Sequence, residues 1–271
     1  PQVREPATII GDVTPEAAAA TGLRAGTPVI AGSADHVAAA LASGIAAPGE
    51  VLLKFGGGGD VLACADRAEP HPAFFFDFHN IPGLALINGC MATSGSFVRW
   101  FQRVIGGGAD LAVLDAEAAV VPPGAGGVIA LPYLLGEKTP LFDPQARGVF
   151  VGLMLHHERG HLFRAVLEGI CCGFRHHLDL LRDDGRPVTR LLAAAGGTRS
   201  PLWMQITADT VGAPVQVVTG DAASAVGVAF VAGMGIGAFD GWDDVRRFVS
   251  VGPIYTPRPE AARAMDETYA I

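Results

Sequence analysis

The sequence predicts an α/β protein in which strands and helices alternate along the chain. Short apolar runs are separated by helical stretches, and glycine or proline stands at many of the boundaries. Half of the 271 residues are hydrophobic and 17% are charged, so the chain can bury a large core. The 36 glycines and 19 prolines form no repeat, which indicates turns and close backbone approaches instead of disorder. Such alternation is typical of helices layered on a sheet.

Caps and turns place the first elements. Thr14 and Pro15 can begin a short helix within a connecting segment over residues 1–26, because threonine is a good N-cap and proline fits the first helical position. Four glycines, residues 56–59, are interpreted as the turn of a hairpin. The elements predicted in this part are a strand over 27–32, a helix over 34–43, hairpin strands over 51–55 and 60–65, a strand over 84–88 and an amphipathic helix over 96–105.

One long amphipathic helix dominates the second half. Apolar residues recur at helical spacing between residues 159 and 181, which predicts a helix with one buried face. The other elements predicted here are a strand over 126–131, a loop-rich stretch over 133–152, a strand over 191–195, a helix from Ser200-Pro201 to about Val211, a strand over 215–218 and a small-residue helix over 222–234.

Charge and cysteine content exclude several classes of protein. A net charge of -8 argues against binding a nucleic-acid backbone or an anionic membrane. No signal sequence or membrane span is predicted. The four cysteines match neither a zinc motif nor a disulfide framework, so the expected compartment is the cytoplasm. Because the chain begins with Pro1, a processed chain, a fragment or a separated domain is expected.

Asp35 stands where a strand gives way to a helix, and two interpretations remain open. An aspartate at this place is often only an N-cap. Alternatively, the helix dipole and the free N–H groups keep its carboxylate ionised, so that it can accept a proton from a substrate hydroxyl.

Two glycine turns could bind phosphate or a nucleotide. In the tetraglycine, and in Gly196-Gly197 at the end of a strand, no Cβ prevents the backbone from approaching a ligand. Neither turn matches the Walker A pattern or the dinucleotide fingerprint, and a plain tight turn is an equally good interpretation of each.

Residues 157–161 spell His-Glu-Arg-Gly-His, which satisfies the HExxH pattern of zinc hydrolases. That chemistry needs both histidines one turn apart on a helix, together with a third ligand. Gly160 interrupts the motif at the start of the long helix. His176 and His177, the nearby candidates for a third ligand, would point along the same helix. We therefore predict no metal-binding residue, although a zinc hydrolase remains a remote alternative.

Three segments carry a resemblance to a known family. They are Ala-Gly-Ser-Ala-Asp at 31–35, a long stretch that begins Leu-Pro-Tyr-Leu-Leu-Gly-Glu-Lys-Thr-Pro at 131–140 and continues to Gly169, and Gly-Gly-Thr-Arg-Ser-Pro-Leu-Trp-Met-Gln at 196–205. In this order they resemble the C-terminal lobe of the FGGY family of carbohydrate kinases, and its xylulokinase-like branch most closely. The matches run from about residue 27 to residue 235.

The resemblance implies a ribonuclease H-like lobe of the actin/hexokinase-type ATPase fold, with a mixed central sheet flanked by helices. Residues 27–271 would form the C-terminal ATP-binding lobe, and residues 1–26 would connect it to an N-terminal lobe that this chain lacks. The implied reaction is ATP-dependent phosphorylation of a sugar hydroxyl, with a ketose such as xylulose as substrate and with ATP and Mg²⁺ as cofactors. The other implied partner is the N-terminal lobe of the same kinase. The oligomeric state stays open, a homodimer being one option.

The family pattern also assigns roles to single residues. Asp35 would accept the proton of the sugar hydroxyl, and His36 would contact the sugar. The positions that would bind the nucleotide are Gly56, Gly57, Gly95, Gly196, Gly197 and Ser200.

Two departures from the family pattern are visible. Relatives usually have Gly-Thr-Ser-Gly where this chain has four glycines, so the hydroxyl groups that would contact phosphate are absent. The N-terminal lobe, which would supply most of the sugar pocket, is also absent, so this lobe alone is expected to be inactive. A catalytically impaired nucleotide-binding module is therefore the main alternative, and the identity of the sugar cannot be predicted.

Overall fold

A mixed seven-stranded sheet forms the centre of the protein. The structure, a computed structural model, describes residues 3–220 and 224–271. The strands lie in the order β11 (Ser250–Tyr255), β10 (Val215–Thr219), β9 (Arg190–Ala194), β3 (Glu50–Phe55), β4 (Gly59–Ala65), β6 (Ala85–Met91) and β5 (Phe75–Phe78). β10, β9 and β3 are parallel, whereas the other neighbours pair antiparallel. The sheet is thus mixed, as predicted.

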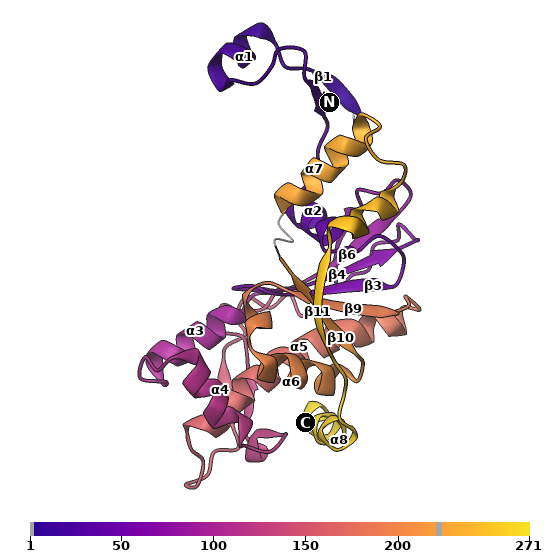
Figure 1. The fold of residues 1–271 in the computed structure, drawn as a ribbon. Coiled ribbons are helices and arrows are strands. Elements are labelled where there is room, and N and C mark those ends of the chain that lie inside the picture. The colour runs from indigo at the N-terminus through magenta and orange to yellow at the C-terminus, as the bar shows by residue number, and fades with distance from the viewer. Residues whose placement is uncertain (1–2, 221–223) are drawn as a thin grey trace.

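Helices cover both faces of this sheet (Figure 1). Alternate strand residues point to opposite faces, so Leu52 and Leu62 pack under Val37 and Ala40 of α2 (Asp35–Ala42). Their neighbours on the other face join the larger core with α5 (Arg159–Asp183) and α6 (Pro201–Val211). On the first side, α7 (Ser224–Gly235) packs on α2. The result is a three-layer arrangement.

Smaller elements surround these layers. α3 (Gly95–Val104) and α4 (Leu111–Ala119) pack against α5, as does the small sheet of β7 (Ile129–Leu131) and β8 (Val149–Val151). α8 (Pro259–Tyr269) packs on α6. Three 3-10 helices complete this part: η1 (Ala125–Gly127), η2 (Gly196–Arg199) and η3 (Trp242–Phe248).

An N-terminal arm extends away from the layers (Figure 1). It consists of β1 (Ile9–Asp12), α1 (Pro15–Thr21) and β2 (Pro28–Ile30). All four residues of β1 are exposed, and α1 has no buried residue. At its base, Ala7 and Ile30 pack against the small core cluster that includes Phe230 and Val231 of α7, so the arm is anchored there while its tip is exposed.

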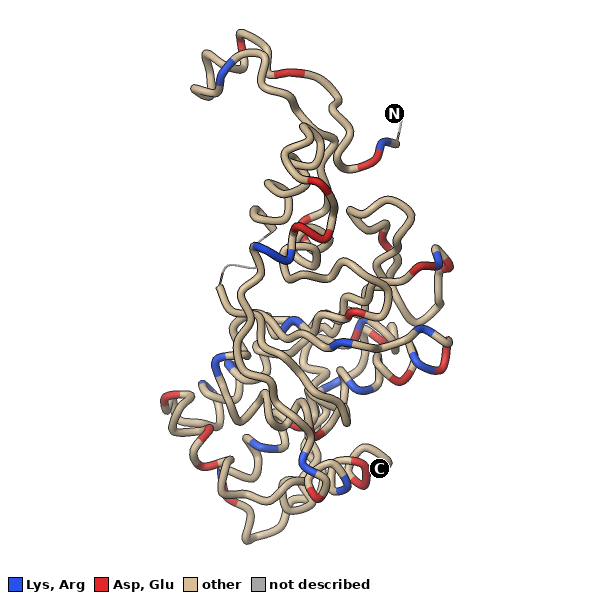
Figure 2. The backbone as a smooth tube through the Cα atoms, turned by 45° about the vertical axis from the view of Figure 1, so that its right-hand side comes forward, with Lys and Arg blue, Asp and Glu red and all other residues tan. Residues whose placement is uncertain are grey.

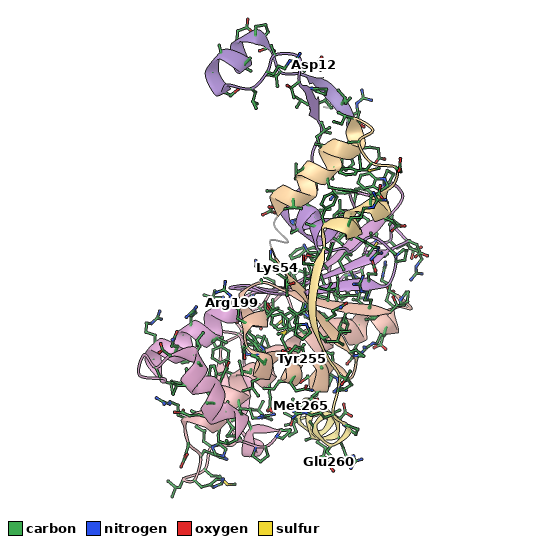
Figure 3. All side chains as sticks on the ribbon, in the orientation of Figure 1. Asp12, Lys54, Arg199, Tyr255, Glu260 and Met265 are labelled. Atoms are coloured by element: carbon green, nitrogen blue, oxygen red, sulfur yellow. The ribbon has the colours of Figure 1, made fainter. Side chains whose placement is uncertain are left out.

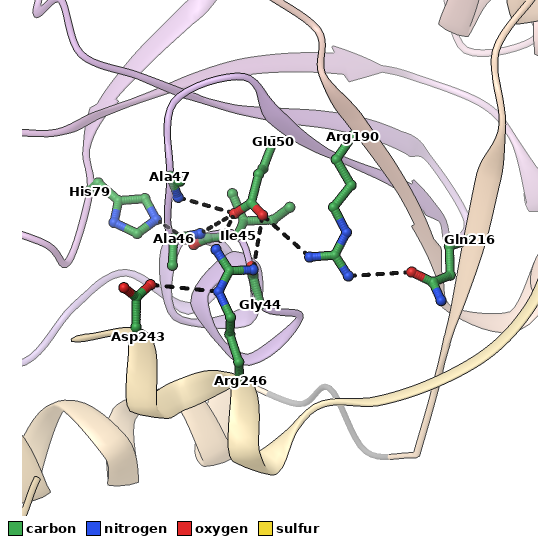
Figure 4. Close-up of polar contacts among 10 residues, drawn as sticks. All are labelled: Gly44, Ile45, Ala46, Ala47, Glu50, His79, Arg190, Gln216, Asp243 and Arg246. Carbon is green, nitrogen blue, oxygen red and sulfur yellow. Dashed lines mark hydrogen bonds and ion pairs between the residues drawn. The ribbon is translucent and has the colours of Figure 1, made fainter. Parts of the chain in front are cut away.

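A buried ion-pair network ties η3 to the end of α2 (Figure 4). The Glu50 carboxylate accepts hydrogen bonds from Arg246 at 2.9 and 3.0 Å and from Arg190 at 3.2 Å. It also accepts from the backbone N–H groups of Ala46 and Ala47, just beyond α2, at 2.9 and 3.0 Å. Glu50, Arg190 and Arg246, which we call the Glu50 network, therefore fix the C-terminal end of α2.

Most predicted elements form within a few residues of their expected bounds. The Thr14 side chain caps α1, Ser200 caps α6, and the long helix begins at Arg159 as expected. The helix predicted over 222–234 begins at Ser224, since residues 222 and 223, like residues 1 and 2 of the connecting segment, lie outside the described residues. The described elements that the sequence did not predict are β1, β5, β8, α4, the three 3-10 helices η1, η2 and η3, β11 and α8.

Among residues 3–220 and 224–271, no helix is both long enough and apolar enough to cross a membrane. The longest, α5, carries charged residues along its length.

Candidate functional site

Both glycine turns leave the sheet at the same edge. β3 and β9 are parallel neighbours, with Lys54 opposite Ala194. The chain continues from β3 into Gly56 and from β9 into Gly196, so the two turns emerge side by side. Figure 3 shows Lys54 and Arg199 at this end of the sheet. The sequence predicted each turn, and the parallel pairing brings them together.

The tetraglycine turn is fastened to the start of α3. The Gly56 carbonyl accepts a hydrogen bond from the N–H of Gly95 at 2.8 Å, and the Gly57 carbonyl accepts from Ser94 and Ser96 at 2.8 and 3.0 Å. A Cβ on Gly95 would lie 2.5 Å from the Gly56 oxygen, so only glycine allows this approach. These bonds use the carbonyl groups of the turn and do not consume its N–H groups.

A pocket of about 1020 Å³ opens between these loops. Its walls come from the tetraglycine turn, η2 and helices α3 to α6. It includes all six residues predicted to bind a nucleotide: Gly56, Gly57, Gly95, Gly196, Gly197 and Ser200. Chain neighbours aside, no atom of the described residues lies within 4 Å of where a Cβ on Gly57 or Gly196 would stand, so these residues leave space beside the backbone at both turns. The pocket is large enough for a nucleotide.

Positive charge lines this pocket, although the protein as a whole is acidic. Arg99 and Arg103 lie one turn apart on α3, and Arg199 comes from η2. Elsewhere acidic and basic residues are mixed along the chain (Figure 2). Such a set of guanidinium groups favours a ligand that carries several negative charges.

One carboxylate shares the pocket with the arginines. Asp115 lies on α4, where burial raises the pKa of its carboxyl group and a hydrogen bond with the Ser200 side chain lowers it. The Ser200 hydroxyl in turn accepts from the N–H of Trp203 at 3.1 Å. A carboxylate repels phosphate, so the end of the pocket near Ser200 suits a group that donates hydrogen bonds.

Asp35 lies outside this pocket, at the first residue of α2. Ala34 is the N-cap residue, so the interpretation of Asp35 as the N-cap is wrong. Its side chain is 90% exposed. The backbone N–H of His36 has the largest effect in lowering the pKa of Asp35, followed by the His36 side chain, and Lys54 adds a smaller electrostatic effect. The carboxylate is thus ionised at neutral pH, within electrostatic reach of Lys54, which lies two residues before the tetraglycine turn.

His36 is held between two carboxylates. Its Nε2 atom lies 2.9 Å from Asp77 Oδ2, and its Nδ1 atom lies 3.4 Å from Asp35 Oδ1. Asp77 comes from β5, at the edge of the sheet. The two residues predicted to meet the substrate therefore lie together, with a third residue that the sequence did not indicate.

The HExxH-like stretch serves to cap α5. His157 precedes the helix, and its ring bonds to the backbone of Met154 at 2.9 Å and of Gly126 at 3.1 Å. Glu158 is the N-cap residue, and its N–H donates to His161 Nδ1 at 3.1 Å. Within the described part of the chain, no three His, Cys, Asp or Glu side chains gather as a metal site. This geometry gives the zinc hypothesis no support.

Sequence reasoning missed the charged residues that the fold adds to the site. Arg99, Arg103 and Asp115 lie on helical faces that read like ordinary solvated surface, and Asp77 lies on a strand that was not predicted. The one available signal was the spacing of Arg99 and Arg103, which puts both on one side of a helix.

Comparison with known proteins identifies relatives over the whole chain. The sequence model described as the FGGY family of carbohydrate kinases, C-terminal domain, matches residues 65–236. A xylulose kinase from Lactococcus lactis subsp. lactis is 31% identical over 275 residues, which cover 100% of this chain and 55% of that protein. This chain spans about half the length of the curated relatives it matches.

Solved structures agree with this result. The crystal structure of a xylulose kinase from Rhodospirillum rubrum superposes with a TM-score of 0.93 at 47% identity, over 100% of this chain and 55% of that one. A structure from Brucella ovis, described as a xyloylose kinase, gives a TM-score of 0.91 at 29% identity, over 100% and 56%. The predicted fold class, a ribonuclease H-like lobe of the actin/hexokinase type, is confirmed by these likenesses.

Proposed function

The chain belongs to the FGGY family of carbohydrate kinases, and on that premise we propose that it is the nucleotide-binding lobe of a kinase that transfers the terminal phosphate of ATP to a sugar hydroxyl. Residues 27–271 would form this lobe. Its partner would be the N-terminal lobe of the same kinase, joined through residues 1–26. The observation that carries the proposal is the arginine-lined pocket between two glycine turns, which contains all six residues predicted to bind the nucleotide.

The pocket fits ATP in both shape and charge. The phosphates would lie against Gly56, Gly57 and Gly95. The N–H groups of the tetraglycine turn are not used to hold α3, and Gly57 has no Cβ that would keep a phosphate away from them. The adenosine would lie toward Gly196, Gly197 and Ser200. The arginines would offset part of the phosphate charge, which is the main requirement of phosphoryl transfer.

Mg²⁺ would arrive with the nucleotide. This ion is commonly held by one or two carboxylates together with the phosphates and water, and the described residues form no dedicated cage for it. When bound, it would neutralise charge on the phosphate oxygens.

Asp35 would orient the attacking hydroxyl and take its proton. Its carboxylate is exposed and its pKa is lowered, so it is ionised and free to accept a hydrogen bond. A carboxylate of this kind is a weak base. It can still take the proton, because the hydroxyl becomes more acidic as its oxygen bonds to phosphorus.

The xylulose kinases among its relatives favour a ketose such as xylulose as the substrate. A gluconokinase from Bacillus licheniformis, 29% identical over 261 residues, makes gluconate the competing sugar. The lobe alone is expected to be inactive, because the highly exposed Asp35 has no second surface to exclude water from the reacting groups.

The test uses the full kinase with the N-terminal lobe restored. ADP release is measured against a panel of ketoses and gluconate. Asp35→Asn should lower kcat by roughly 10²- to 10⁴-fold. The matched control is Glu260→Gln, which alters another exposed carboxylate in the first turn of a helix, at the far end of the protein (Figure 3). It should keep full activity.

Two results would contradict parts of this proposal. Full activity of Asp35→Asn would remove that residue from its role. ATP binding without sugar-dependent ADP release in the unaltered kinase would favour the alternative, a nucleotide-binding module in which the tetraglycine turn has impaired catalysis.

A further inference from the structure

Lys54 and Asp60 lie on the side of the sheet that α2 covers. They are direct partners in the pairing of β3 with β4. Alternate residues of a strand point to opposite faces, and Leu52 and Leu62, two positions away on the same strands, pack under α2. The Lys54 ammonium group therefore lies close to the tetraglycine turn, on the same face of the sheet as α2.

The direction of α2 brings its first residue, Asp35, toward Lys54. The C-terminal end of the helix is fixed at Glu50, the first residue of β3. Lys54 lies near the last residue of the same strand, so the N-terminal end of α2 lies toward it. The electrostatic effect of Lys54 on the pKa of Asp35 agrees with this placement.

The arginine-lined pocket opens on the other side of the sheet. Phe55, the neighbour of Lys54, belongs to the larger core and lines this pocket together with Gly56 and Gly57. The arginines of the pocket come from α3 and η2. The terminal phosphate of a bound ATP would therefore have to pass the tetraglycine turn to reach a hydroxyl group held by Asp35. Lys54 is a cation on the side where this phosphate would arrive.

The Lys54 side chain is available to a ligand. Its Nζ atom lies 3.5 Å from Asp60 Oδ2, and 35% of the side chain is exposed. Among the described residues Asp60 is its only ion-pair partner, and an ammonium group has three hydrogens to donate. An ion pair as exposed as this one contributes little to stability, so we expect variants of Lys54 to fold.

We propose that Lys54 is a catalytic residue, whose ammonium group contacts the phosphoryl group as it moves from ATP to the sugar. This inference rests on the proposed function. In the reaction the bond between the terminal phosphorus and the bridging oxygen of ATP breaks, the bond from phosphorus to the sugar oxygen forms, and the sugar proton goes to Asp35. Lys54 keeps its hydrogens and offsets charge on the phosphoryl oxygens. It thereby supplies donors beside a turn that has only glycine.

The first experiment measures the kinetics of the full kinase. Lys54→Gln should lower kcat by roughly 10²- to 10³-fold. The KM for ATP should change by less than about threefold, because the contact is strongest in the transition state. Lys54→Arg keeps the charge and should retain more activity than Lys54→Gln. The matched control is Arg67→Gln, which removes a guanidinium group 3.5 Å from the Glu69 carboxylate, just beyond the opposite end of β4. It should keep full activity.

The second experiment tests whether Lys54 meets the terminal phosphate. The lysines of the full kinase are reductively methylated with ¹³C, which keeps their charge, and Lys54→Arg identifies the Lys54 signal. With the ketose present, the magnesium complex of a non-hydrolysable ATP analogue should shift this signal. The magnesium complex of ADP should shift it much less, because ADP lacks the terminal phosphate.

Full kcat in Lys54→Gln, or a Lys54 signal that the ATP analogue shifts no more than ADP does, would overturn the inference. A loss confined to gluconate and seen as a higher KM would also overturn it, because Lys54 would then bind the carboxylate of the sugar instead of phosphate. If Lys54→Gln does not fold, the spectra of the unaltered kinase decide. A kinase that shows the analogue-specific shift but releases no ADP with any sugar would refute the proposed function and leave the phosphate contact of Lys54 in place.

Discussion

Removal of the Glu50 carboxylate should strongly destabilise this protein. The side chain is 9% exposed and accepts hydrogen bonds from two arginines and two backbone N–H groups. Glu50→Ala removes this shared acceptor, but Arg190 and Arg246 are each 35% exposed and keep contacts with Gln216 and with Gly44 and Asp243, so the cost should lie between those of surface and buried ion pairs, at about 2–3 kcal/mol. At about 2–4 °C for each kcal/mol in a domain of this size, the melting temperature should fall by roughly 4–12 °C.

The assay is thermal unfolding followed by circular dichroism, with Glu69→Ala as the matched control. Glu69 pairs with Arg67 at 3.5 Å on the surface and is 67% exposed, so its loss should cost at most about 1 kcal/mol. Glu50→Gln keeps one acceptor oxygen and should fall between the two. Amide hydrogen exchange should also quicken at Ala46 and Ala47, because both donate to Glu50.

The stability that the Glu50 carboxylate provides should decrease at acidic pH. Burial by itself raises the pKa of Glu50, but the hydrogen bonds from Arg246 and the backbone outweigh it, so the pKa in the folded state is lowered from 4.5. The unfolded chain then binds the proton more readily. The unaltered protein is therefore more stable than Glu50→Ala by the full amount above about pH 4.5, and this difference in the free energy of unfolding disappears as the pH falls through the folded-state pKa of Glu50. A melting temperature of Glu50→Ala equal to that of Glu69→Ala at pH 7 would refute this account of the Glu50 network.

Three further predictions follow from particular contacts. Gly57→Thr should fold normally, since no atom of the described residues beyond its chain neighbours lies within 4 Å of its Cβ. It should raise kcat/KM of the full kinase by restoring a hydroxyl group for phosphate. Gly58→Ser should instead lower the melting temperature, because its Cβ would lie 2.7 Å from the Met91 oxygen. Gly169→Ala should cost more than about 3 kcal/mol by urea unfolding, since its Cβ would overlap the Ala130 oxygen of β7; an unchanged midpoint would contradict this packing. Burial lowers the pKa of His79 and of His177 from 6.5 to about 4. The free energy of unfolding should therefore fall as the pH is lowered from 6.5 to 4, because the unfolded chain binds these protons more readily. A free energy of unfolding that stays constant over this range would refute the burial of both rings in the neutral form.

Local signals in the sequence were enough to predict the elements that carry the proposed nucleotide site. A run of glycines between two apolar segments specifies a hairpin wherever it packs, and the caps at Thr14 and Ser200 act within three residues of themselves. The apolar residues of α5 likewise recur at helical spacing, so the sequence alone shows which face of this helix is buried. β3 and β9 each end in a glycine turn, and the sequence predicted each turn separately. The parallel pairing of the two strands then brings both turns to the same pocket.

The remaining elements depend on partners that lie far away in sequence. β5 is four residues long and pairs only with β6 in the main sheet, so the run Phe-Phe-Asp-Phe gives no sign of its role. β11 contains Pro253, which argues against a central strand, but at the edge of the sheet the missing N–H costs little. Asp77 reaches His36 across 41 positions of sequence, which no local pattern encodes.

The two ends of α2 differ in a way that bears on catalysis. Its C-terminal end is fixed by the Glu50 network and buried residues, whereas its N-terminal end presents Asp35 with 90% of the side chain exposed. A carboxylate in open water gains little from electrostatic preorganisation, because the solvent screens it. On the proposed function, a second surface would have to cover this end of the helix for Asp35 to act in phosphoryl transfer. The rigid anchoring at one end keeps Asp35 in place while that surface closes over it, so motion should be concentrated in the covering surface and not in α2.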